Sequence, residues 1–142
     1  MTAITLLILS LFLSNLKAPD TKAVYLIEPE RVNPYEAIWN AVITIESNSN
    51  PLAYHMEKNG CASIGIAQIQ QSRLDDFRSR TGIAYSLADM YSPDKAKSVF
   101  MHYASEIQPH NIERISREWN GGAKGMSKKS TIKYYLKVKA KL

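Results

Sequence analysis

The sequence has the length and composition of one globular domain. It holds 142 residues, of which 45% are hydrophobic and 22% are charged, and its formal net charge is +5. A domain of this size can bury a core without disulfides or metals. The single cysteine, Cys61, excludes an internal disulfide and a zinc site built from thiols. We therefore expect no metal and no other cofactor.

The first 18 residues differ from the rest of the chain. Residues 4–13 form an almost unbroken apolar run, ITLLILSLFL. About ten apolar residues suit a secretory signal and are few for a bilayer core of roughly 30 Å. We predict a signal peptide or an N-terminal membrane anchor at 1–18, with a buried helix of the fold as the alternative, and a linker or arm at 19–32. The protein is then exported, to the periplasm or the cell exterior, or anchored to the inner membrane.

From Asn33 onward the sequence predicts a series of short helices. Apolar spacing, caps and glycines delimit five of them: from Asn33 to before Pro51, and over 72–82, 92–107, 112–121 and 131–138. The stretch 62–70, ASIGIAQIQ, alternates with a strand-like period, which allows a small β-hairpin. We predict a mainly α domain over residues 33–142.

Glu46 lies at the expected end of the first helix, directly before the polar run 47–50. A helix C-terminus carries partial negative charge, and apolar neighbours such as Ile43 and Ile45 desolvate a carboxyl group. Both effects raise the pKa of a carboxyl, which a general acid requires near neutral pH. Taken alone, the pattern fits a solvated surface glutamate better than a catalytic one.

Four short motifs occur in one order along the chain. They are Glu46-Ser47-x-x-Asn50-Pro51-x-Ala53, Gly65-Ile66-Ala67-Gln68-Ile69, Trp119-Asn120-Gly121-Gly122, and Thr131-Ile132-Lys133-Tyr134 continuing to Val138. The set resembles the motifs of lytic transglycosylases related to the soluble lytic transglycosylase domain. This resemblance covers residues 35–138. It implies a lysozyme-like helical domain whose groove binds the glycan strands of peptidoglycan.

The resemblance also implies a reaction. Glu46 would protonate the glycosidic oxygen between N-acetylmuramic acid and N-acetylglucosamine. Its carboxylate would then take the proton of the muramic acid 6-hydroxyl, which closes a 1,6-anhydro ring. Such an enzyme is a lyase that needs no second carboxylate, unlike most glycosidases. Five residues would bind substrate: Ser47, Gly65, Gln68, Asn120 and Tyr134.

Several of these residues have structural alternatives. Ser47 can cap its helix, the Gln68 amide can hold its own loop, and Tyr134 can belong to the core. The sequence also departs from the family pattern. His55 stands where the family often has a serine, Ala67 replaces a groove-lining methionine, and Trp119 replaces a tyrosine; the longer loop before Gly65 lets Ser63 take the place of the serine.

Two other functions stay open. A muramidase of the hydrolase class would need a second carboxylate about 6.5–9.5 Å from Glu46 to activate water, and Glu57 is the candidate. A noncatalytic cell-wall-binding component would keep the groove without turnover. The departures at His55, Ala67 and Trp119 favour this last function.

The C-terminal segment 117–142 is basic, with eight Lys or Arg residues and one Glu. It suits anionic partners such as muramyl carboxylates, teichoic acids or a membrane surface. We expect no nucleic acid partner, because the sequence has no known reader motif. Wall turnover, a secretion or conjugation apparatus, and a phage assembly all fit these features.

Overall fold

The computed structural model describes residues 33–58, 60–107 and 111–142. The segments expected to be a signal or anchor (1–18) and an arm (19–32) lie outside these residues. The described elements are, in chain order, α2 (Glu36–Ser47), β1 (Tyr54–Met56), β2 (Ala62–Ile64), β3 (Ile69–Gln70), α3 (Gln71–Thr81), η1 (Leu87–Tyr91), α4 (Pro93–Glu106), α5 (Ile112–Gly121), η2 (Gly125–Ser127) and α6 (Ser130–Lys139).

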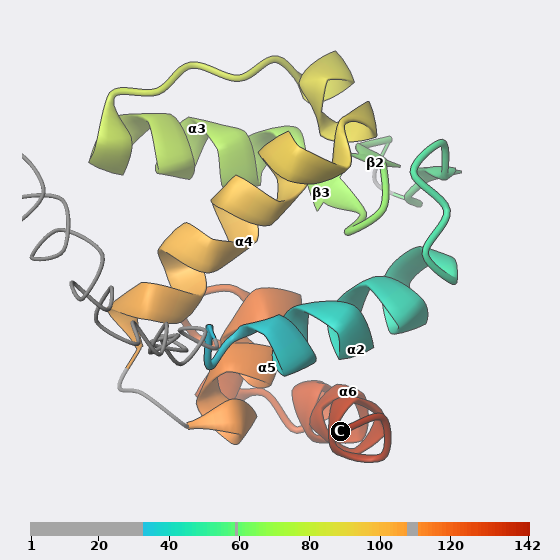
Figure 1. Ribbon diagram of the computed structural model, residues 1–142, viewed down its shortest axis with the longest axis vertical. Helices are drawn as coiled ribbons and strands as arrows, with labels where there is room; N and C mark the ends of the chain where they lie inside the picture. Colours follow the sequence, from blue (N-terminus) through green and yellow to red (C-terminus); the bar gives the residue numbers. More distant parts are fainter. Residues whose placement is uncertain (1–32, 59, 108–110) are drawn as a thin grey trace, which may run out of the picture. The chain divides into compact units, whose positions relative to one another are not determined.

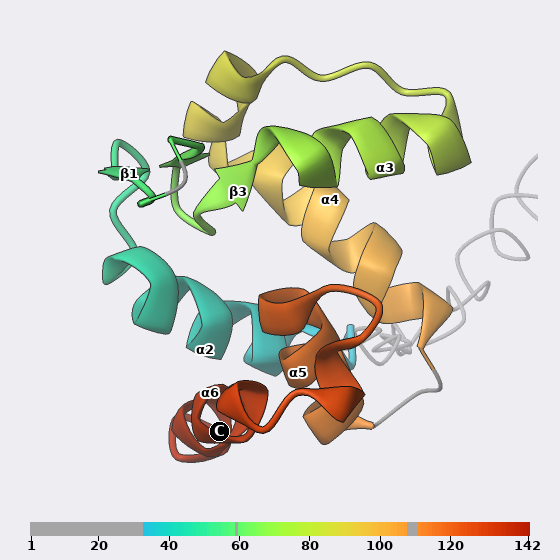
Figure 2. The same ribbon diagram turned by 180° about the vertical axis from the view of Figure 1, so that it is seen from behind.

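The helices form two groups on either side of α4. Figures 1 and 2 place α3, η1 and the strands on one side of α4, and α2, α5 and α6 on the other. Contacts join α5 to α6, and α6 to α2. The buried core draws on the apolar stripes of these helices, among them Val42, Val99, Phe100, Ile115 and Val138, each at most 2% exposed. Burial of such side chains is the main force that holds the helices together.

The strands form one antiparallel sheet in the order β1-β2-β3. Tyr54 pairs with Ile64, and Ser63 pairs with Gln70. The prediction of a mainly α, lysozyme-like helical domain was therefore wrong in its class, since the described residues combine five helices with a three-stranded sheet. β1 was not predicted because all three of its residues are exposed, so they lack the alternation that marks a half-buried strand.

The end of α2 places Glu46 beside a tight turn. The helix stops because Asn48 and Ser49 have φ angles of 54° and 61°, in the left-handed region that asparagine tolerates better than most residues. The hydroxyl of Ser47 donates to the carbonyl of Ile66 over 2.7 Å. This bond ties the end of α2 to the loop between β2 and β3.

Arg117 fixes α6 against α5 from the inside. It is 8% exposed, and its guanidinium donates to Glu113 Oε1 at 2.7 Å, the Met126 carbonyl at 2.7 Å and Thr131 Oγ1 at 3.1 Å. A buried guanidinium is tolerated only when its donors are satisfied in this way. Arg117 thereby sets where α6, and Tyr134 on it, lies relative to α2.

None of the described helices has both the length and the apolar character required to span a bilayer.

Candidate functional site

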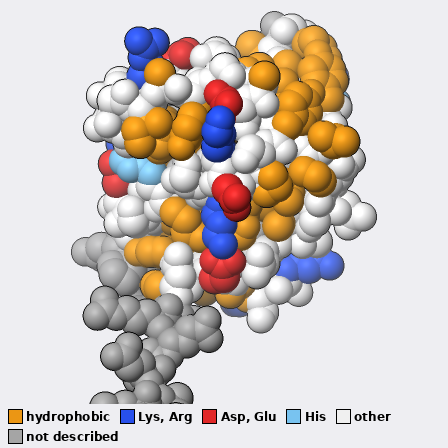
Figure 3. Space-filling view, turned by 45° about the horizontal axis from the view of Figure 1, so that its top comes forward, with side chains coloured by type: hydrophobic (Ala, Val, Ile, Leu, Met, Phe, Trp, Pro, Cys, Tyr) orange, Lys and Arg blue, Asp and Glu red, His pale blue; other side chains and the backbone are white. Residues whose placement is uncertain are grey.

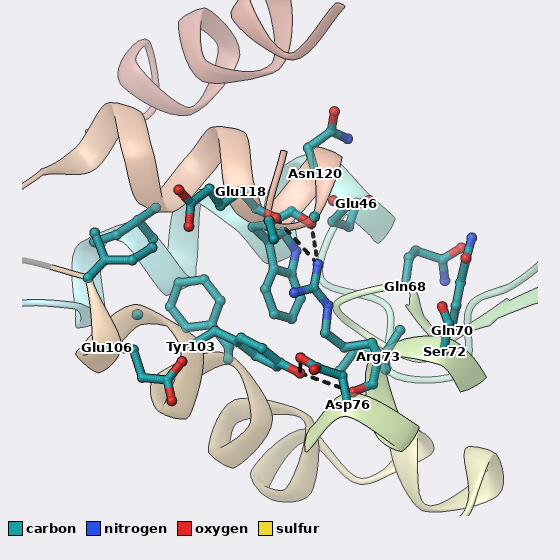
Figure 4. Close-up of a pocket in the computed structure, with 18 of the residues that line it drawn as sticks. Glu46, Gln68, Gln70, Ser72, Arg73, Asp76, Tyr103, Glu106, Glu118 and Asn120 are labelled. Atoms are coloured by element: carbon teal, nitrogen blue, oxygen red, sulfur yellow. Dashed lines mark hydrogen bonds between the residues drawn. The ribbon is translucent and has the colours of Figure 1, made fainter. Parts of the chain in front are cut away.

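A groove of about 730 Å³ lies between the strands, α3, α4 and α5. Its lining is mixed: carboxyl, amide and guanidinium groups stand beside aromatic rings. Figure 4 shows Glu46, Gln68 and Asn120 on one part of the groove and Tyr103 and Glu106 on another. A volume of this size is typical of ligand sites in proteins, which span about 300–1,000 Å³.

Glu46 lines the groove from the last turn of α2. Its pKa is raised above the ordinary 4.5, chiefly because burial disfavours the charged carboxylate. The hydrogen bond from Tyr134 opposes this rise, the nearby carboxylate of Glu57 adds to it, and the charge of Lys137 opposes it again. Glu46 is therefore closer to proton exchange at neutral pH than an exposed glutamate.

Tyr134 holds the carboxyl group of Glu46. Its hydroxyl donates to Glu46 Oε1 over 2.7 Å, although the two residues are 88 positions apart. Tyr134 is 8% exposed, and its pKa is raised by burial, by the charge of Glu46 and by this bond. The phenol therefore stays protonated and acts as a permanent donor. The structure thus brings together two of the residues that the motifs singled out.

A second carboxylate faces the same groove. Glu57 lines it together with Ser63 and Gln70. The Ser63 hydroxyl donates to Glu57 Oε1 at 3.2 Å and accepts from Gln70 Nε2 at 3.0 Å, so the three side chains form one chain of hydrogen bonds. His55, which is exposed, lies 3.9 Å from Glu57 through Nε2. Ser63 thus lines the groove beside Glu57, whereas His55 does not line it.

The other predicted binding residues divide into two sets. Gln68 and Asn120 line the groove; the amide of Gln68 also donates to the Gly65 carbonyl at 3.0 Å. Ser47 and Gly65 do not line it. Gly65 has a φ of +76°, and a Cβ there would collide with the Met90 carbonyl, so its close approach is to η1 and not to a ligand.

Two of the departures from the family pattern lie in the core. Ala67 is 1% exposed and is not among the groove residues, so it does not take the place of a groove-lining methionine. Trp119 is 8% exposed, and its ring packs edge-on against Phe100 at 5.1 Å between centroids. It lines the groove, and most of its side chain is buried in the core.

A charged cluster centred on Arg73 was not predicted from the sequence. The Arg73 guanidinium lies 4.6 Å from the Tyr103 ring centroid and 4.8 Å from that of Trp119. The Tyr103 hydroxyl donates to Asp76 Oδ2 at 2.6 Å. One signal for this cluster exists in the sequence: positions 73, 76 and 80 follow the spacing that places charged side chains on one face of a helix.

The basic residues of the C-terminal segment differ in their exposure and contacts. Arg117 is buried, and Lys128 donates to the Gly121 carbonyl at 2.7 Å, whereas Lys133 and Lys137 on α6 are exposed. On the face shown in Figure 3, acidic and basic side chains alternate and do not gather by sign. Across the described ranges, no cluster of three or more His, Cys, Asp or Glu residues is suited to hold a metal ion.

Comparison with known proteins gives one structural likeness. No protein-family model matches the sequence, and no curated protein matches it. The fold is similar to a chain in the crystal structure of Aeromonas hydrophila PliI in complex with Meretrix lusoria lysozyme, with a TM-score of 0.59 and 23% sequence identity. The likeness covers 74% of this chain and 88% of that chain. At this identity it establishes the fold alone.

These comparisons correct the family and the activity that the motifs predicted. No lytic transglycosylase is matched, and the similar structure pairs PliI with a lysozyme. The assignment to the lytic transglycosylases was therefore wrong, and so was the prediction of a glycan-cleaving lyase. Two of the motifs contain residues that hold the backbone. Ser47 donates to the Ile66 carbonyl, and Thr131 donates to the Gly125 carbonyl at 2.7 Å. The similar structure contains a lysozyme, and the binding of glycan strands by this chain stays a prediction.

Proposed function

We propose that the protein is a cell-wall-binding component that holds a glycan strand of peptidoglycan in the groove beside Glu46. The observation that carries this proposal is the composition of the groove. Amide side chains of Gln68, Gln70 and Asn120 line it together with the carboxyl of Glu46 and the ring of Tyr103. This combination of polar groups and an aromatic surface is the one that an amino-sugar chain requires.

The chemistry of the lining matches the ligand group by group. An amide offers both donors and an acceptor, which complement the N-acetyl and hydroxyl groups of amino sugars. The raised pKa of Glu46 favours a protonated carboxyl that can donate a hydrogen bond to a sugar oxygen. A wall ligand also requires export of the protein, which we predict from residues 1–18.

Co-sedimentation with insoluble peptidoglycan tests the proposal. Asn120 is exposed and lines the groove, so Asn120→Trp should fill the groove and weaken binding about ten-fold or more. Lys133→Trp introduces the same ring at an exposed position of α6 outside the groove and should bind like the wild type. Equal binding by the wild type and both variants would overturn the proposal.

One observation favours hydrolysis of the bound strand as a second candidate function. Glu46 and Glu57 line the same groove, and the charge of Glu57 contributes to the raised pKa of Glu46. Two carboxyl groups, one of them protonated, are what an inverting hydrolase uses. Reducing ends released by the wild type, and lost in Glu46→Gln and Glu57→Gln, would establish hydrolysis. Binding without release supports the noncatalytic component.

A further inference from the structure

Three arginines line the groove, Arg73, Arg80 and Arg114, and two of them form ion pairs with carboxylates. Arg80 contacts Asp76 at 3.0 Å and Glu106 at 2.8 Å. Arg114 contacts Glu118 at 2.8 Å. Within the described part of the chain, no carboxylate lies at ion-pair distance from Arg73.

The guanidinium of Arg73 is held in a fixed orientation. It lies against the rings of Tyr103 and Trp119, whose centroids are 6.4 Å apart, and Nη2 donates to the Trp119 carbonyl over 2.7 Å. Figure 4 shows Arg73 reaching from α3 toward the helix that carries Glu118 and Asn120. Within the described residues, the hydrogen bonds of the guanidinium leave from Nη2, to the carbonyls of Glu118 and Trp119. An arginine has five N–H donors, so donors remain for a ligand in the groove.

Asp76, whose charge acts on Arg73 without an ion-pair contact, is committed to other partners. Asp76 accepts the Tyr103 hydroxyl at 2.6 Å and the Arg80 Nε at 3.0 Å. A fixed, partly buried guanidinium without a carboxylate partner is suited to a planar anion, which it binds through two parallel N–H donors. Glu46 and Glu57 would repel the same anion at their part of the groove.

We propose that Arg73 forms a subsite for a carboxylate group on the bound glycan strand. The inference rests on the proposed function and adds to it the position at which the ligand carries its charge. Two sources share this chemistry: an acidic sugar of the strand and the peptide attached to that sugar. Because Glu46 and Glu57 disfavour an anion, the subsite also sets the register in which the strand lies in the groove.

Calorimetric titration of three ligands tests the subsite. They are neutral N-acetylglucosamine oligomers, glycan strands freed of peptide, and the same strands with their peptides. The wild type should bind the carboxylated strands about ten-fold more tightly than carboxyl-reduced strands of equal length. Arg73→Gln should lose this difference and keep its affinity for neutral oligomers. Arg78→Gln, an exposed residue of the same helix, should behave like the wild type.

Each outcome separates the two claims. Preference for strands without peptide assigns the carboxylate to the sugar, and preference for strands with peptide assigns it to the peptide. Equal affinity of the wild type for carboxylated and reduced strands would overturn the subsite alone. A uniform loss of affinity in Arg73→Gln would also overturn it, since that result indicates a structural role. No binding of any ligand would overturn the proposed function and the subsite together. Should Arg73→Gln fail to fold, the affinities of the wild type for carboxylated and for carboxyl-reduced strands still test the subsite.

Discussion

The hydroxyl of Tyr134 donates a 2.7 Å hydrogen bond to Glu46 Oε1, which joins α6 to the last turn of α2. This bond and the burial of Glu46 act in opposite directions on its pKa, and burial is the larger effect. The carboxyl is thus held in place and kept readier to bear a proton than an exposed glutamate. Arg117 fixes the position of α6 and so sets this contact.

Replacing Tyr134 by phenylalanine should raise the pKa of Glu46 further. The change removes a hydrogen bond that stabilises the carboxylate, and it leaves the burial in place. The free energy of unfolding should fall by about 1 kcal/mol. The measurement is an NMR titration of the Glu46 side-chain carboxyl. Tyr135→Phe, one position further along α6, should leave that titration unchanged; a lower pKa of Glu46 in Tyr134→Phe would contradict the argument.

Glu46→Gln should stabilise the protein at neutral pH and not in acid. The folded-state pKa of Glu46 lies above 4.5, so the folded protein binds this proton more tightly than the unfolded chain does. Stability of the wild type therefore declines as pH rises from below 4.5 through the folded-state pKa, and the variant lacks this decline. Urea unfolding of both proteins at about pH 3.5 and about pH 7.5 measures the difference. A difference that grows toward acid would have the wrong sign.

Gly65→Ala should destabilise the fold far more than Gly82→Ala. The two glycines have nearly equal φ angles, +76° and +75°, so the cost of a left-handed alanine, about 1 kcal/mol, is common to both. A Cβ on Gly65 collides with the Met90 carbonyl, whereas one on Gly82 meets nothing within 4 Å. We expect Gly65→Ala to cost more than about 3 kcal/mol in thermal or urea unfolding. Equal costs would show that η1 does not pack there.

Arg117→Lys should destabilise the contact between α5 and α6 by about 2–3 kcal/mol. A lysine cannot reach Glu113, Met126 and Thr131 at once, which leaves buried acceptors without a donor. Arg114→Lys is the matched control on the same helix, because its contact with Glu118 lies near the surface and should cost under about 0.5 kcal/mol. Similar small losses in both variants would contradict the role of Arg117.

The helices could be predicted from sequence because their apolar spacing is local. The segment 92–107 corresponds to α4 at Pro93–Glu106, and 131–138 corresponds to α6 at Ser130–Lys139. β1 could not be predicted, since its register depends on β2 and not on its own residues. Helix ends set by left-handed residues, such as Asn48 after α2, carry only a weak signal in the sequence.

Site residues that belong to a motif could be predicted from the sequence. Site residues whose surroundings come from distant parts of the chain could not. Glu46 and Tyr134 were both candidates, and the structure joins them; their role in binding stays a prediction. Arg73 was missed because its setting comes from Tyr103 and Trp119, 30 and 46 positions away. Ser47 and Gly65 were assigned to the ligand because a motif does not distinguish a residue that contacts a ligand from one that shapes the loop behind it.

Amide NMR titration of the labelled protein with peptide-free glycan strands tests whether the groove beside Glu46 binds a glycan strand. We predict chemical-shift changes that saturate and that gather at Gln68, Gln70 and Asn120 and at the end of α2. Changes confined to another surface, such as the shallow depression lined by Tyr35, Ile83 and Tyr85, would contradict it. No saturating change at all would contradict it equally.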